Sequence, residues 1–236
     1  MKKTLYYYFL ISIALGHDPE VESVDWKQYY RAGVVRSDLY DSGLKGFSRL
    51  KRTTFKTFKD LRFYFHNYDK ETETRIRYKS SCRFTKYNDI YFFRTILYEK
   101  NTIAKGNLRY LYSQGVGYFI FDKNNYNLTY ELGPAFDNSD YFNSQIRTSF
   151  LKNSFSFDVF LKNIKGKLEI DHFNQVSEKI NDESLSRLQI LGEFQLSINN
   201  LFDMIVGNFQ EYQNKKIVHN NISIAFSISR PIDWNL

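Results

Sequence analysis

The chain has 236 residues and a formal net charge of +7, and it contains one cysteine, Cys82. A single cysteine excludes an internal disulfide and any metal site built on paired cysteines. Aromatic residues make up 18% of the chain, with 22 Phe and 19 Tyr, and they favour strands, so the composition predicts an all-β protein. The positive charges are spread along the chain rather than gathered in a block, so we expect no nucleic-acid partner.

The N-terminal segment has the three parts of a secretory signal peptide. Lys2 and Lys3 precede an apolar run of about ten residues, and Ala14 and Gly16 supply small residues where a signal peptidase reads them. We therefore expect a signal peptide over 1–16, a leader over 17–25, a barrel domain over 26–229 and a C-terminal tail over 230–236. A buried N-terminal strand is the alternative interpretation of the apolar run.

Alternation of apolar and polar residues with a period of two predicts about twelve strands in the rest of the chain. A hairpin over 106–137, which turns at the sequence DKNN, shows this alternation in both arms. The segments 69–74 and 137–145 are polar and are expected to be loops. Outside the hairpin, strands are expected near 26–35, 44–51, 55–68, 75–84, 89–100, 154–159, 167–173, 186–199, 201–210 and 217–229.

The polar faces of the expected strands carry too much charge for a dry core. Arg75, Arg77, Lys79 and Arg83 share one face of one strand, and unpaired charges are costly to bury. Long strands joined alternately by tight turns and longer polar loops are typical of bacterial outer-membrane barrels. We therefore predict an antiparallel up-and-down transmembrane β-barrel of about 12 strands in the bacterial outer membrane, with its apolar face against lipid. The alternative is a soluble exported β-barrel or sandwich that binds a ligand or partner.

One stretch, 80–137, resembles a known family. It contains the motifs Tyr98-Glu99-Lys100, Gly115-Val116-Gly117-Tyr118 and Leu132-Gly133-Pro134, with Asp122 in the turn. These motifs are similar to those of the salt-induced outer-membrane proteins, a bacterial family whose domain has no known function. The resemblance implies an outer-membrane β-barrel and brings no catalytic residues.

The polar faces also define a candidate lumen, in which cations concentrate on the third to sixth strands and acids on the seventh to tenth. In a closed barrel these halves face each other, which predicts either crossing ion pairs that plug a narrow pore or a transverse field in an open one. The expected lumen-lining residues are Arg62, His66, Arg75, Arg77, Lys79, Arg83, Arg94, Arg109, Glu131, Glu169, Asp171, Arg187, Glu193 and His219.

We expect no catalytic residue, cofactor or metal, because no metal-ligand cluster, phosphate-binding loop or dinucleotide fingerprint is present. The predicted function is a small or plugged pore, or a structural or scaffold component of the envelope. Its expected partners are outer-membrane lipid, the barrel assembly machinery and other envelope proteins. An outer-membrane hydrolase or acyltransferase is a third hypothesis, for which a nucleophile would have to lie beside a histidine base.

Overall fold

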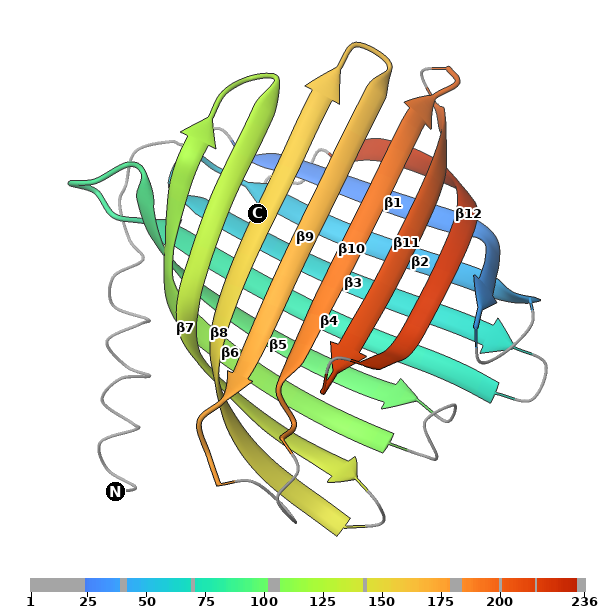
Figure 1. Ribbon diagram of the computed structural model, residues 1–236. Coiled ribbons are helices and arrows are strands. Elements are labelled where there is room, and N and C mark those ends of the chain that lie inside the picture. The colour runs from blue at the N-terminus through green and yellow to red at the C-terminus, as the bar shows by residue number, and fades with distance from the viewer. Residues whose placement is uncertain are drawn as a thin grey trace.

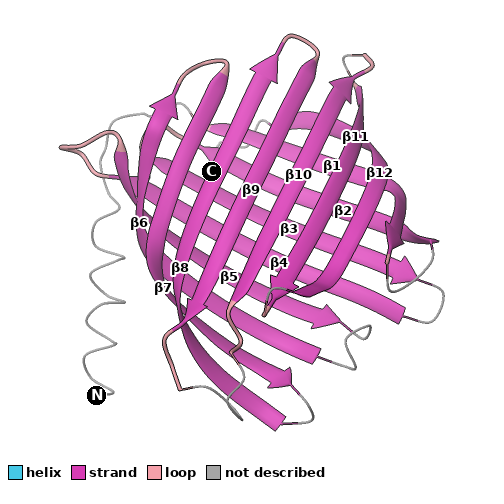
Figure 2. Ribbon diagram, in the orientation of Figure 1, coloured by secondary structure: helices cyan, strands magenta, loops and turns pink. Residues whose placement is uncertain are grey.

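A computed structural model describes residues 24–38, 42–68, 71–101, 107–141, 144–178, 184–199, 201–214 and 216–232. These residues form one closed barrel of antiparallel strands (Figures 1 and 2). The strands are β1 (Asp25–Ser37), β2 (Ser42–Thr53), β3 (Thr57–Tyr68), β4 (Glu71–Arg83), β5 (Ile90–Asn101), β6 (Asn107–Asp122), β7 (Tyr126–Tyr141), β8 (Ser144–Leu161), β9 (Ile164–Gln175), β10 (Arg187–Ser197), β11 (Phe202–Gln213) and β12 (Lys216–Ile232).

Each strand pairs with its neighbours in sequence, and β1 closes the ring by pairing with β12 from Trp26↔Ile232 to Ser37↔Asn221. This is the up-and-down order, in which every strand edge is satisfied by another strand. The prediction of an all-β, antiparallel barrel of about twelve strands is confirmed. The predicted signal peptide lies outside the described residues.

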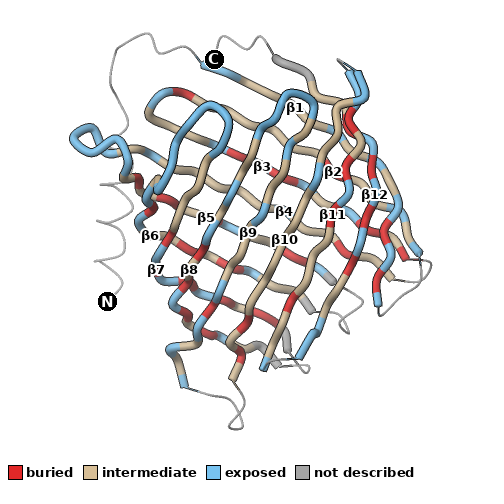
Figure 3. The backbone as a smooth tube through the Cα atoms, turned by 45° about the horizontal axis from the view of Figure 1, so that its top comes forward, coloured by how far each residue is buried: buried red, intermediate tan, exposed pale blue. Residues whose placement is uncertain are grey.

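The barrel is polar inside and apolar outside. On β3, the side chains of Asp60 and Arg62 are 1% and 6% exposed, whereas those of Leu61 and Phe63 are 44% and 42% exposed. Figure 3 shows the same alternation of buried and exposed positions along other strands. A soluble barrel would bury the apolar face, so this arrangement matches a barrel whose outer surface is solvated by lipid. Within the described ranges there is no helix with the length and apolarity needed to cross a membrane.

Two of the predicted loops were wrong. β4 already begins at Glu71, and β7 continues to Tyr141 before β8 begins at Ser144, so most of 69–74 and 137–145 is strand. The polar residues that suggested loops belong to the polar face of the barrel, because Glu73 and Asp137 are both buried in the interior. In these two segments a polar sequence indicates a strand that faces the lumen rather than a turn.

β6 and β7 approach each other closely at two glycines. A Cβ atom on Gly133 would overlap the carbonyl oxygen of Gln114 and lie 2.7 Å from the Cα atom of Gly115. Because the opposing atoms belong to the backbone, no side chain can move to make room. Glycine is therefore required here by the approach of the two strands.

We predict that Gly133→Ala lowers the free energy of unfolding by about 2 kcal/mol or more, since overpacking of this kind forces the backbone to shift. Urea unfolding in lipid vesicles measures the change. Gly192→Ala on β10 is the matched control, because a Cβ atom there meets nothing within 4 Å, and it should change stability by less than about 0.5 kcal/mol. Equal stability of the two variants would contradict the account of the β6–β7 contact.

Candidate functional site in the barrel lumen

The strand registers place thirteen of the fourteen candidate lumen residues on the interior face. Residues directly opposite each other on neighbouring strands share a face of the sheet, as in the pairs His66↔Glu73 and Arg62↔Arg77 of β3 and β4. Successive pairings extend this face around the ring. The thirteen are Arg62, His66, Arg75, Arg77, Lys79, Arg83, Arg109, Glu131, Glu169, Asp171, Arg187, Glu193 and His219.

Arg94 was predicted to line the lumen, and the structure contradicts this. Its neighbours Phe93 and Thr95 are buried on the interior face of β5, so Arg94 lies on the outer face, paired with Ser80 and Gln114. β5 carries apolar residues on both faces, so its alternation does not reveal which face is inside. The positive charge of Arg94 was therefore a poor guide to its orientation.

Several acids of the lumen were missed by the sequence analysis. Glu73, Glu99, Asp137 and Glu211 are all buried on the interior face. Glu73 and Glu99 could have been found from parity, because Glu73 shares a face with Arg75 and Glu99 pairs with Arg109 across β5 and β6. The β3–β6 wall is consequently less positive than the sequence analysis predicted.

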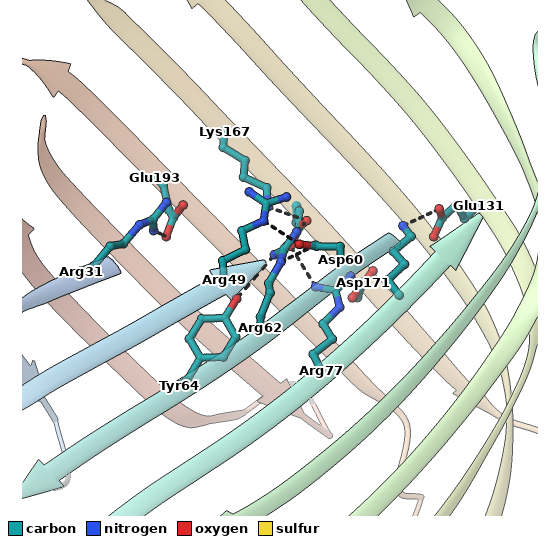
Figure 4. A network of polar contacts seen from close by, with 12 residues as sticks. Arg31, Arg49, Asp60, Arg62, Tyr64, Arg77, Glu131, Lys167, Asp171 and Glu193 are labelled. Atoms are coloured by element: carbon teal, nitrogen blue, oxygen red, sulfur yellow. Dashed lines mark hydrogen bonds and ion pairs between the residues drawn. The ribbon is translucent and has the colours of Figure 1, made fainter. Parts of the chain in front are cut away.

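The middle of the lumen contains a carboxylate held by two arginines of the same wall. The Oδ1 atom of Asp60 lies 2.6 Å from Nε of Arg49, and its Oδ2 atom lies 2.6 Å from Nε of Arg62 (Figure 4). Asp60 is almost fully buried, and a buried carboxylate is stable only when it is paired in this way. Asp60 thus holds both guanidinium groups in place on the interior face of the barrel.

Arg62 is also paired across the barrel. Its Nη1 atom lies 4.0 Å from Oε1 of Glu169 on β9, and β3 and β9 are six strands apart in either direction around the ring. The other oxygen of Glu169 lies 3.5 Å from Nη1 of Arg77, while Nζ of Lys167 lies 2.7 Å from Oε1. Glu169 therefore joins diametrically opposed walls and crosses the lumen.

Two more ion pairs connect strands that are three apart in the ring. Lys79 on β4 places Nζ 2.5 Å from Oε1 of Glu131 on β7, and the hydroxyl of Tyr91 donates to the same oxygen at 2.9 Å. Arg31 on β1 lies 2.7 Å from Glu193 on β10. Both ion pairs narrow the lumen. Figure 4 shows Arg31 with Glu193 on one side of Arg62 and Glu131 on the other.

A further network lies toward the end of the barrel at which β3 ends and β4 begins. Glu73 accepts from Arg75 at 3.3 Å and lies 2.8 Å from Nδ1 of His66. Arg109 bridges Glu99 and Glu211, at 3.8 and 3.9 Å. This network also joins distant strands, because Arg109 lies on β6 and Glu211 lies on β11.

Arg187 and Asp137 form a buried ion pair beside two phenylalanine rings. The Nη1 atom of Arg187 lies 3.0 Å from Oδ2 of Asp137. Its guanidinium lies 4.9 Å from the ring centroid of Phe150 and 4.6 Å from that of Phe173, a cation–π geometry that suits arginine. The two rings also face each other edge to face, with centroids 6.0 Å apart.

The side chains leave little open space in the lumen. The central cavity, which is bordered by Arg77, Glu169 and Glu193 among others, has a volume of about 100 Å³. That space suits a few water molecules rather than an organic solute. Among the described residues, no three His, Cys, Asp or Glu side chains lie close enough together to hold a metal ion.

A family comparison matches most of the chain. The model of the family described as "Protein of unknown function, DUF481" matches residues 36–218, which is well over half of the sequence. Among curated proteins, none matches the chain.

Solved structures with a similar fold are outer-membrane barrels. The NanC porin has a TM-score of 0.54 at 8% identity, over 87% of this chain and 99% of that one. A KdgM porin in complex with disordered oligogalacturonate has a TM-score of 0.51 at 10% identity, over 86% and 98%. The COG4313 outer membrane channel from Pseudomonas putida F1 has a TM-score of 0.50 at 9% identity, over 92% and 99%. At these identities the likeness establishes the outer-membrane β-barrel fold.

We predict that Lys79→Met lowers the free energy of unfolding by about 3 kcal/mol, because it leaves the buried Glu131 carboxylate without its cation. The double variant with Glu131→Gln should recover most of this loss, since neither charge then remains. Urea unfolding in vesicles compares the three proteins. If the single and double variants were equally destabilised, the pair would not be the reason for the loss.

Proposed function

We propose that this protein, which belongs to the family of proteins of unknown function DUF481, is an integral outer-membrane barrel that forms a narrow pore. The proposed pore is constricted by ion pairs that cross its lumen. The observation that carries the proposal is Glu169, which lies between Arg62 and Arg77 of the opposite wall and beside a cavity of only about 100 Å³. Such a lumen passes water and small ions and excludes larger solutes.

The outer surface supports the membrane location. Residues of β12 that face outward, such as Ile222, Ile224 and Phe226, are 47–56% exposed, while Ser223 and Ala225 between them are buried. An apolar surface of this kind is stable against hydrocarbon and a liability in water. We propose export through the signal peptide over 1–16 and insertion by the barrel assembly machinery, in keeping with this surface.

The charged interior favours a pore over a purely structural barrel. Buried ion pairs add little net stability, and well-packed apolar residues can replace them at no loss. A barrel that serves only as a scaffold therefore gains nothing from a lumen lined with Arg, Lys, Asp and Glu. A lumen that must stay hydrated and select ions does need these groups.

We further propose that the protein is not an enzyme. His66 pairs with Glu73 and His219 contacts Asn221 at 3.2 Å, so among the described residues neither of these lumenal histidines hydrogen-bonds a serine. A hydrolase would need such a base within reach of a nucleophile. The contacts of the two histidines instead support a role in the lumenal network.

We predict that Glu169→Gln raises single-channel conductance about twofold or more in planar bilayers and shifts selectivity toward anions, because Arg62 and Arg77 lose their shared carboxylate. Glu178→Gln is the control, since Glu178 is exposed beyond the end of β9 and removes the same charge outside the lumen. Conductance and reversal potential in a salt gradient are the measurements. A conductance unchanged by Glu169→Gln would contradict the proposed constriction.

A further inference from the structure

We infer that the outer surface of β5–β8 contains a binding site for a phosphorylated, acylated glycolipid of the outer leaflet. The site is a groove of about 520 Å³, within the range of ~300–1,000 Å³ that small-molecule sites occupy. Its outward-facing lining residues are Ile96, Tyr110, Tyr112, Phe136, Asn138, Arg147 and Ser149. This inference rests on the proposed outer-membrane location and is independent of whether the lumen conducts.

The lower part of the groove suits acyl chains. Ile96, Tyr110 and Phe136 come from three successive strands, and each is 49–50% exposed. The register aligns them, because Tyr112 pairs with Ile96 on one side and with Phe136 on the other. These side chains therefore form an apolar strip that runs across the strands on the lipid-facing surface of the barrel.

The upper part of the groove suits a phosphate. Arg147 is the fourth residue of β8 and lies beside Asn138, its partner in the register. Arg147 is exposed, and no ion-pair partner for it occurs among the described side chains. An arginine fork and an amide together can hold a phosphate through charge-assisted hydrogen bonds.

The position of Arg147 along the barrel selects the leaflet. The tight turns after β2, β6 and β8 lie at one end, together with the start of β1 and the end of β12. In outer-membrane barrels that end is periplasmic. Arg147 lies near the opposite end, at the outer rim, so the headgroup in this groove belongs to the outer leaflet, where the phosphorylated lipid carries a sugar backbone.

The test uses the full barrel, refolded in a mild nonionic detergent, with purified lipid A as the probe and native mass spectrometry as the readout. We expect Arg147→Glu to weaken lipid A binding about tenfold, the effect of losing one good ionic contact. Ser149→Trp, which fills the groove from β8, should weaken it similarly. Arg36→Glu is the matched control, because Arg36 is an exposed cation on the outer end of β1, away from the groove, and it should leave binding unchanged.

Three further probes complete the experiment. Dephosphorylated lipid A and phosphatidylglycerol are each expected to bind weakly. Inorganic phosphate is expected not to compete with lipid A. Equal losses in Arg147→Glu and Arg36→Glu, equal affinity for dephosphorylated lipid A or for phosphatidylglycerol, or full binding by Ser149→Trp would each overturn the site. Heat-modifiable mobility of each variant on gels shows that the barrel is folded, so a failure here is distinguished from failure of the barrel itself.

Discussion

Hydrocarbon offers no hydrogen-bond partner and no solvation for charge, and this constraint determines the rest of the structure. The backbone meets it by closing twelve strands into a ring, with β1 paired to β12. The side chains meet it by placing most charged groups of the strands on the interior face, where acids and bases can pair. Arg36, Arg94 and Arg147 are among the exceptions on the outer face, where Arg94 lies beside the polar Ser80 and Gln114.

The lumen follows from the same constraint. A ring of twelve strands is wide enough to remain open if its interior is small and uncharged, but long side chains from opposite walls can also meet across it. Here Glu169, Glu131 and Glu193 each reach a cation on a distant strand, so the charges fill the space that they surround. The interior is thus narrow while it stays polar.

The sequence was sufficient to predict the barrel, its strand number and most of its interior face, because period-two alternation is strong on strands such as β3, β4 and β12. It failed on β5, where aromatic and aliphatic residues lie on both faces and Arg94 was misplaced. It also failed on 69–74 and 137–145, where lumenal acids resemble loop residues. The sequence predicted crossing ion pairs as one of two possibilities, but it could not show which residues meet, because the contact of Arg62 with Glu169 depends on the register of every strand between them.

The central claim is that the polar face lines the lumen and the apolar face contacts lipid. Spin labels placed singly from 221 to 228 on β12, in a Cys82→Ser background and in bilayers, test it directly, because the inward residues there are small and uncharged. The account predicts collision rates with oxygen that peak at 222, 224, 226 and 228 and fall at the positions between them, with little access for a water-soluble nickel chelate at the peaks. Peaks at the odd positions, or no period of two, would contradict it.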